Sequence, residues 1–145
     1  MVDYSIIVPV YCNEDTLEDL ITQINTKVFK KNKNLKGQVV FCEDGSSDKS
    51  FDKLKHLKGI FQNTKIIKLT RNFGQISAIF SGLQNIESKS YIIMSADLQD
   101  PVSLINEFLY NHFQKNYQVV CGVRKKREDS ILDRFFANIF YKSLS

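Results

Sequence analysis

The chain has 145 residues, of which 43% are hydrophobic and 25% charged, and this is enough to form one globular domain with its own core. Its formal net charge of +4 is too small to indicate nucleic-acid binding, although it suits a ligand or a surface that carries phosphate groups. The three cysteines are odd in number and lack CxxC spacing, which argues against a disulfide framework or a zinc site and favours a reducing cytoplasm.

The N-terminal segment predicts a buried strand at residues 4–10, YSIIVPV. It does not look like a secretion signal, because Asp3 stands where positive charge is expected and the apolar run is too short. No stretch of the sequence approaches the roughly 20 apolar residues of a membrane-spanning helix. We therefore expect a cytoplasmic protein whose contact with a membrane would be peripheral.

Four more apolar runs follow, and segments with helical spacing separate the runs. The further strands are expected at 38–42, 65–69, 91–95 and 117–123. Apolar residues recur with helical spacing at 17–24, 51–57, 76–83 and 104–109. Continuous apolar strands that alternate with helices predict the α/β class, with a Rossmann-like, mostly parallel sheet flanked by helices on both faces.

Polar clusters follow the first four predicted strands. They are YCNED (11–15), EDGSSD (43–48), TRNFGQ (70–75) and ADLQDP (96–101). In open sheets of this kind, ligands bind at the carboxyl ends of the strands. The four clusters are therefore predicted to meet at the ligand-binding edge of the sheet.

The cluster after the second strand contains Asp44, which could accept a hydrogen bond from an N–H group of a nucleobase. The stretch can also be interpreted as a capped turn, because Gly45 suits a turn and Ser47 or Asp48 can cap the next helix. Both interpretations stay open from this stretch alone.

The cluster after the third strand places Arg71 just before the N-terminus of a predicted helix. Helix N-termini attract anions through their free N–H groups. The alternative is that Asn72 caps the helix and Arg71 is simply solvated. The sequence contains neither GxGxxG nor GxxxxGK[ST], so phosphate groups would have to be neutralised in another way.

The cluster after the fourth strand could supply a divalent cation for this purpose. Asp97 and Gln99 alternate along a segment that we expect to be extended, so both side chains could face one ion. Their oxygens are the hard ligands that Mg²⁺ and Mn²⁺ prefer. Asp100 and Pro101 have a structural explanation, because Asp as N-cap followed by Pro starts a helix well.

Basic residues follow the fifth predicted strand. Arg124 and Arg127 suit phosphate oxygens, with a solvated loop as the alternative. Residues 131–144 place apolar side chains along one helical stripe flanked by Arg134 and Lys142. This pattern predicts either a helix that covers the core or one that lies in a membrane interface.

The stretches SIIVPVY, EDGSSD, LTRNFGQISAIFSGL, SADLQDP and VVCGVRKKRED together resemble, in order and spacing, the family 2 glycosyltransferases. The resemblance is greatest to the polyprenyl-phosphate branch, which includes the dolichol-phosphate mannose synthases, and it covers nearly the whole chain. It implies a GT-A fold that binds a nucleotide-sugar donor, a UDP- or GDP-sugar, together with Mg²⁺ or Mn²⁺.

The resemblance also implies roles for individual residues by motif position. The nucleotide-binding residues would be Pro9, Tyr11, Asp44, Arg71, Ala96 and Asp97. The metal ligands would be Asp97 and Gln99, with Ser95 as a weak ligand where the family usually has the first carboxylate of Asp-x-Asp. Asp97 and Arg124 would be the catalytic residues, and Arg124, Arg127 and Arg134 would bind the phosphates of the nucleotide or of a lipid.

The activity implied is transfer of a sugar, with inversion, to undecaprenyl or dolichyl phosphate at the cytoplasmic face of a membrane. One alternative is a saccharide acceptor in capsule or lipopolysaccharide synthesis, and another is a non-catalytic fragment that only binds nucleotide. Enzymes of the family extend well past 145 residues. Residues 1–145 are therefore expected to form a single nucleotide-sugar-binding domain that lacks most of the acceptor-binding and membrane portion.

Overall fold

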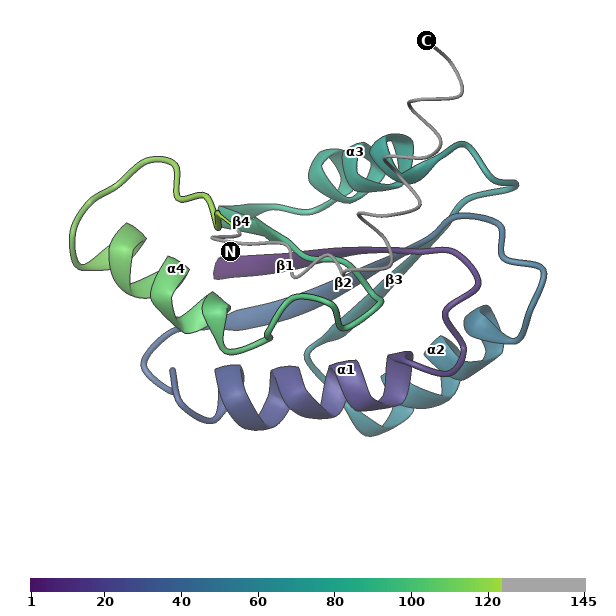
Figure 1. Ribbon diagram of the computed structural model, residues 1–145, viewed down its shortest axis with the longest axis horizontal. Helices are drawn as coiled ribbons and strands as arrows, with labels where there is room; N and C mark the ends of the chain where they lie inside the picture. The colour runs from purple at the N-terminus through teal and green to yellow at the C-terminus, as the bar shows by residue number, and fades with distance from the viewer. Residues whose placement is uncertain (124–145) are drawn as a thin grey trace, which may run out of the picture.

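The computed structural model describes residues 1–123 (Figure 1). Strands and helices alternate along these residues, as the sequence predicts. The elements are β1 (Val2–Val10), α1 (Leu17–Ile24), the π-helical turn η1 (Asn25–Phe29), β2 (Gly37–Glu43), α2 (Ser50–Ile60), β3 (Thr64–Lys68), α3 (Gln75–Asn85), β4 (Ser88–Ile93) and α4 (Leu104–Phe113).

The four strands form one parallel sheet in the order β3-β2-β1-β4. Ile7 of β1 lies opposite Val40 of β2 on one side and Ile93 of β4 on the other. Residues 4–10 and 38–43 are all buried. Helices cover both faces of these two central strands, which explains why their sequences are continuous apolar runs.

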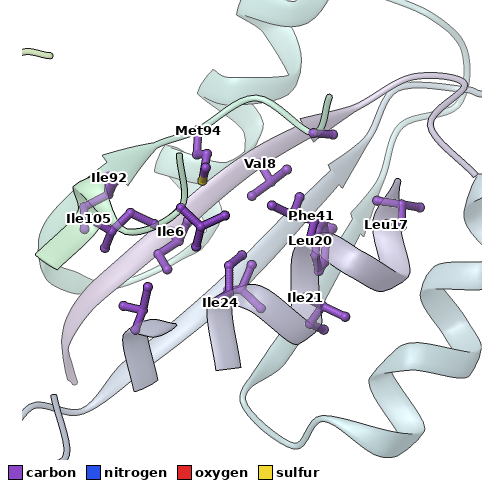
Figure 2. Packing of buried hydrophobic residues seen from close by; sticks show 14 of the residues in the cluster. Ile6, Val8, Leu17, Leu20, Ile21, Ile24, Phe41, Ile92, Met94 and Ile105 are labelled. Carbon is purple, nitrogen blue, oxygen red and sulfur yellow. The ribbon is translucent and has the colours of Figure 1, made fainter. Parts of the chain in front are cut away.

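Three helices, α1, α2 and α4, cover one face of the sheet, and their apolar side chains belong to the larger core cluster (Figures 1 and 2). Apolar residues three or four positions apart lie on one side of a helix. In α1 this spacing buries Leu17, Leu20, Ile21 and Ile24. Figure 2 shows these four side chains in the same cluster as Ile6, Val8, Phe41, Ile92, Met94 and Ile105.

Within residues 1–123, α3 covers the opposite face, where the smaller core cluster lies (Figure 1). A Cβ atom at Gly82 would stand 2.8 Å from both the Cys42 Sγ and the Ile7 Cγ2 atoms. Glycine at this position therefore lets α3 approach the sheet closely. The same packing buries the Cys42 side chain, and this burial raises the pKa of its thiol.

The prediction of a fifth strand at 117–123 is wrong, because these residues lie outside the sheet. Asn116 adopts a left-handed conformation with φ of 58°. The N–H of Tyr117 then donates to the Asn111 carbonyl at 3.2 Å, and the Tyr117 carbonyl lies 2.8 Å from Nδ1 of His112. The backbone thus turns back onto the end of α4 at Tyr117, whose N–H and carbonyl are used there and not in strand pairing.

The predicted helix start at Asp100 is also wrong by several residues. Helix α4 begins at Leu104, with Ser103 as its N-cap. The N–H of Leu104 donates to the Pro101 carbonyl at 3.0 Å, so Pro101 opens a turn that precedes the helix. Arg124, Arg127, Arg134 and the stripe at 131–144 lie outside the described residues.

In the part of the chain that the structure describes, no helix is both long enough and apolar enough to cross a membrane.

Candidate functional site

The loops after β1, β2, β3 and β4 contribute to one cavity of about 290 Å³ at the carboxyl ends of the strands. The loops after β1 and β2 lie together at the right of Figure 1. The lining residues are Pro9, Val10, Tyr11, Asn13, Asp44, Asn72, Gly74, Gln75, Ser95, Ala96 and Asp97. The cavity therefore forms at the sheet edge where the sequence places the polar clusters.

Asp44 joins the second loop to the third. Its side chain is 2% exposed, and its Oδ1 and Oδ2 atoms accept the N–H groups of Phe73 at 2.8 Å and Gly74 at 2.9 Å. Such bonds offset much of the cost of burying a carboxylate. A carboxylate has about four acceptor positions, so Asp44 can accept a further bond from a ligand in the cavity.

Two glycines allow this contact between the loops. Gly74 has φ of 93°, and the side chain of Asn72 also accepts its N–H at 2.9 Å. Gly45 has φ of 68°, and a Cβ atom there would lie 2.5 Å from the backbone carbon of Arg71. The two loops thus touch through their backbones, at a place where only glycine fits.

Asp97 stands in the fourth loop with an exposed side chain. Its Oδ1 accepts the N–H of Gln99 at 3.1 Å, and Leu98 between them has φ of 59°. The expectation of an extended segment at 97–99 is therefore wrong, because the chain turns at Leu98. Because of this turn, the alternation of an extended strand does not place the side chains of Asp97 and Gln99 on the same side. Gln99 is also not among the cavity-lining residues.

Asp97 and Ser95 nevertheless fit a divalent cation as part of a ligand set. Both line the cavity, and Asp97 keeps acceptor positions beyond the one that Gln99 uses. Within residues 1–123, no group of three His, Cys, Asp or Glu side chains could hold a metal. Mg²⁺ is commonly bound by one or two carboxylates, with water and substrate phosphates as the other ligands, and this donor set suits that arrangement.

The fourth loop is tied to the first by Thr16. Its hydroxyl donates to the Ala96 carbonyl at 2.7 Å, and it also lies 3.2 Å from the Asn13 carbonyl. Ala96 is 4% exposed and lies next to Asp97. The backbone that carries Asp97 is therefore fixed against the first loop.

The structure brings most of the predicted site residues together and leaves some apart. Pro9, Tyr11, Asp44, Ser95, Ala96 and Asp97 line the cavity. Arg71 does not line it, and its guanidinium carbon instead lies 4.8 Å from the centre of the Phe73 ring. Arg124, Arg127 and Arg134 are outside the described residues, so their roles stay predictions.

Sequence reasoning missed three polar residues of the cavity, Asn13, Asn72 and Gln75. All three stand in polar clusters that follow predicted strands, so their neighbourhood was identified but their individual contribution was not. The sequence predicts Asn72 as a helix cap, whereas α3 has Gly74 as its N-cap.

Comparison with known proteins agrees with this geometry. The family model described as glycosyl transferase family 2 matches residues 5–143. An uncharacterized glycosyltransferase of Bacillus subtilis, YkcC, is 33% identical over 145 residues, which cover 99% of this chain and 44% of that protein. The undecaprenyl-phosphate 4-deoxy-4-formamido-L-arabinose transferase of Pseudomonas fluorescens is 33% identical over 132 residues, which cover 90% of this chain and 38% of the relative.

Solved structures share the fold. A mannosyltransferase of Pyrobaculum calidifontis in complex with GDP-Man and Mn²⁺ matches with a TM-score of 0.58 at 18% identity, over 70% of this chain and 35% of that one. S. aureus TarS in complex with UDP matches with a TM-score of 0.59 at 21% identity, over 76% of this chain and 32% of that one. The predicted GT-A fold is thus confirmed.

The chain spans less than half the length of these curated relatives. The family match nevertheless covers nearly all of its residues, and the parallel sheet and the cavity at its carboxyl edge agree with that match. The chain belongs to glycosyl transferase family 2.

Proposed function

We propose that the cavity binds a nucleotide-sugar donor, a UDP- or GDP-sugar, together with Mg²⁺ or Mn²⁺, and that the sugar is transferred with inversion to polyprenyl phosphate. The observation that carries the proposal is that Asp44, Ser95 and Asp97 line one cavity at the carboxyl ends of the parallel strands. One carboxylate is buried and held by backbone N–H groups, and the other is exposed. These environments suit two roles, one toward the nucleoside and one toward a metal and phosphates.

At the nucleoside end, Pro9 and Tyr11 offer apolar surface. The Tyr11 ring is 48% exposed although it lines the cavity, so it is available for contact with a planar base. Asp44 accepts an N–H of the base through an acceptor position that Phe73 and Gly74 leave open. Arg71 contributes positive charge next to these loops rather than a direct contact with the base.

At the phosphate end, Asp97 and Ser95 would hold the cation, and Gln99, which does not line the cavity, would contribute through a water molecule. A bound divalent cation supplies positive charge that stabilises the departing nucleoside diphosphate. Arg124 serves the same purpose in this proposal, and Arg127 and Arg134 bind the phosphate of the lipid. Asp97 and Arg124 are accordingly the residues that we propose as catalytic.

A phosphate acceptor fits the side chains that the cavity contains. A phosphate monoester has a second pKa of about 6, so it is largely ionised at neutral pH and can attack the anomeric carbon without a general base. Neither His56 nor His112 lines the cavity. The Pseudomonas fluorescens relative, which is named as an undecaprenyl-phosphate transferase, supports this choice over a saccharide acceptor. Such an acceptor would place the protein at the cytoplasmic face of a membrane, in peripheral contact with it.

Two measurements test the proposal on the whole chain. Calorimetry with UDP and with GDP should show binding that needs Mn²⁺ or Mg²⁺ and is lost on addition of EDTA. Incubation with radiolabelled UDP- and GDP-sugars and polyprenyl phosphate should then give a labelled product that is extracted into organic solvent. Label that appears only in a water-soluble saccharide would favour the saccharide acceptor.

A non-catalytic role, in which the cavity binds nucleotide without sugar transfer, is the alternative that these measurements distinguish. In that case calorimetry would show metal-dependent nucleotide binding, but neither sugar transfer nor hydrolysis of the donor would be detected. Binding of both nucleotides that EDTA leaves unchanged would contradict the metal role, and no binding of either would contradict the donor site.

A further inference from the structure

The loops after β1 and β2 are joined by two carboxylates that each serve the other loop. The N–H of Glu14 donates to Oδ2 of Asp48 at 3.2 Å, and the N–H of Lys49 donates to Oε2 of Glu14 at 2.7 Å. Each carboxylate thus accepts a backbone N–H from the segment that carries the other. Hydrogen bonds of this kind to ionised acceptors are stronger than those between neutral groups.

Further bonds lie alongside this reciprocal pair. The N–H of Asn13 donates to Oγ of Ser50 at 2.8 Å, and the N–H of Cys12 donates to Oγ of Ser46 at 3.1 Å. Cys12 has φ of 52°, so the backbone just after Tyr11 is held in a left-handed conformation. The first loop is therefore fixed to the second loop at consecutive residues.

Neither Glu14 nor Asp48 lines the cavity, whereas Tyr11 and Asn13 on one loop and Asp44 on the other do. The pair therefore joins the two lining segments without itself lining the cavity. Both carboxylates are half-buried and precede the N-termini of α1 and α2, where negative charge is favourable. None of the ion pairs found in residues 1–123 involves either of them.

We propose that Glu14 and Asp48 are positioning residues that preorganise the donor cavity. They act through the backbone, by holding the Tyr11–Asn13 segment at a fixed distance from Asp44, and they do not touch the donor. The inference rests on the proposed function, because it presupposes that a nucleoside diphosphate binds between these loops. A site that is ordered before binding loses less conformational entropy on binding, so its affinity is higher.

The experiment is a double-mutant cycle on the whole chain, with UDP and GDP in the presence of Mn²⁺ as the probes. Glu14→Ala and Asp48→Ala should each weaken binding of the nucleotide that the unsubstituted chain prefers, by about five- to tenfold. Each substitution removes a different hydrogen bond, but both bonds hold the same two loops together. Loss of one bond should already free the loops, so the double variant should lose clearly less affinity than the product of the two single losses, whereas independent roles would multiply them. Glu14→Gln and Asp48→Asn keep an acceptor oxygen and should recover most of the affinity.

Glu18→Ala is the matched control. Glu18 on α1 pairs with Lys53 on α2, so this change also removes a contact between the segments that follow the two loops, but farther from the cavity. It should leave nucleotide affinity within about twofold of the unsubstituted chain. Amide hydrogen exchange gives a readout that needs no ligand, since the Lys49 N–H should exchange faster in Glu14→Ala but not in Glu18→Ala.

The outcomes separate the two proposals. If the unsubstituted chain binds neither nucleotide, the donor site is wrong and the positioning role is wrong with it. If the unsubstituted chain binds and the Ala variants change the melting temperature but not the affinity, only the positioning role is overturned. A fully multiplicative loss in the double variant would overturn the claim that the two hydrogen bonds act together in positioning the loops.

Discussion

The proposed nucleoside side of the cavity and its proposed metal side use their acidic residues in different ways. On the proposed nucleoside side, Asp44 accepts hydrogen bonds from two backbone N–H groups. Glu14 and Asp48 join the loops after β1 and β2. On the proposed metal side, Asp97 is exposed and accepts the N–H of the nearby Gln99. Acidic residues at the same edge of the sheet therefore have two kinds of role. Some hold the loops of the cavity in place, and others keep their oxygens available for a ligand.

Replacement of Asp97 should give the largest functional effect with the smallest structural one. Asp97→Ala is expected to reduce metal-dependent nucleotide binding and any sugar transfer by about 100-fold, because the proposed cation loses its carboxylate. The melting temperature should stay within about 1 °C, since the side chain is exposed. Calorimetry with Mn²⁺ and UDP or GDP, together with thermal unfolding, checks both parts.

Asp52→Ala provides the control for that comparison. Asp52 is an exposed carboxylate on α2 whose ion-pair partner is Lys55. It should change neither binding nor melting temperature appreciably. A large loss of stability in Asp97→Ala, with affinity unchanged, would reverse the division of roles between the two sides.

Replacement of Asp44 should combine both effects. Asp44→Ala leaves the N–H groups of Phe73 and Gly74 without their carboxylate, so we expect a loss of about 2–3 kcal/mol of unfolding free energy. Nucleotide affinity should fall as well, because the proposed acceptor for the nucleobase N–H is lost. Urea unfolding and nucleotide calorimetry, run at a temperature where the variant is folded, measure the two losses separately.

An unchanged unfolding midpoint in Asp44→Ala would mean that water replaces the carboxylate at the loop at no cost. The cavity-building role would then have to be assigned to the glycines and to Asn72, which also accepts the Gly74 N–H.

Addition of an acid on the proposed metal side should strengthen metal-dependent nucleotide binding. Ser95 lines the cavity two residues before Asp97, and a carboxylate is a stronger ligand for Mn²⁺ than a hydroxyl. Ser95→Asp is therefore expected to lower the Mn²⁺ concentration needed for half-maximal nucleotide binding by about tenfold, or roughly 1.4 kcal/mol. A titration with Mn²⁺ at fixed nucleotide measures the shift, and an unaltered curve would show that position 95 is not a ligand.

The smallest expected effect is on how the unfolding free energy depends on pH, and it arises from Asp48 in the loop that also carries Asp44. Burial by itself raises the pKa of Asp48, but hydrogen bonds from Ser50 and from the N–H of Glu14 outweigh it, so the pKa is lowered. The folded form therefore gains stability above the unfolded pKa of about 3.9, and this gain is lost as the pH falls through the lower folded value.

Urea unfolding between pH 5 and pH 2 should thus show a slightly shallower decline for Asp48→Asn than for the unsubstituted chain. Asp3, Glu18 and Asp52 also have lowered pKa values and contribute a background that both proteins share. Identical slopes would indicate that the Asp48 contacts persist when its carboxyl group is protonated.

Local pattern was enough to predict four strands, the helices between them and the sheet edge that carries the cavity. It failed where the backbone leaves regular geometry. The turn at Leu98 and the reversal at Asn116 both depend on left-handed residues that are not glycine, and such residues give little warning in a sequence. These two positions account for the wrong geometry at 97–99 and the wrong strand at 117–123.

The candidate site was predicted at the level of motifs but not of partners. That Asp44 binds the third loop, or that Thr16 reaches the Ala96 carbonyl, depends on which strands become neighbours in the sheet. Spacing along the chain does not contain this information, because the bonded residues are 29 and 80 positions apart. The order β3-β2-β1-β4 is what brings them together.

The close packing of α3 on the sheet also sorts the cysteines by chemical reactivity. Cys42 is buried beneath Gly82, and its raised thiol pKa disfavours the thiolate that reacts with alkylating reagents. Cys12 and Cys121 are exposed. A maleimide dye would therefore attach to Cys12 and Cys121 and spare the core, and with Cys121→Ser it would report from a single position beside Tyr11. In a chain that contains no tryptophan, this gives the donor cavity an optical signal of its own.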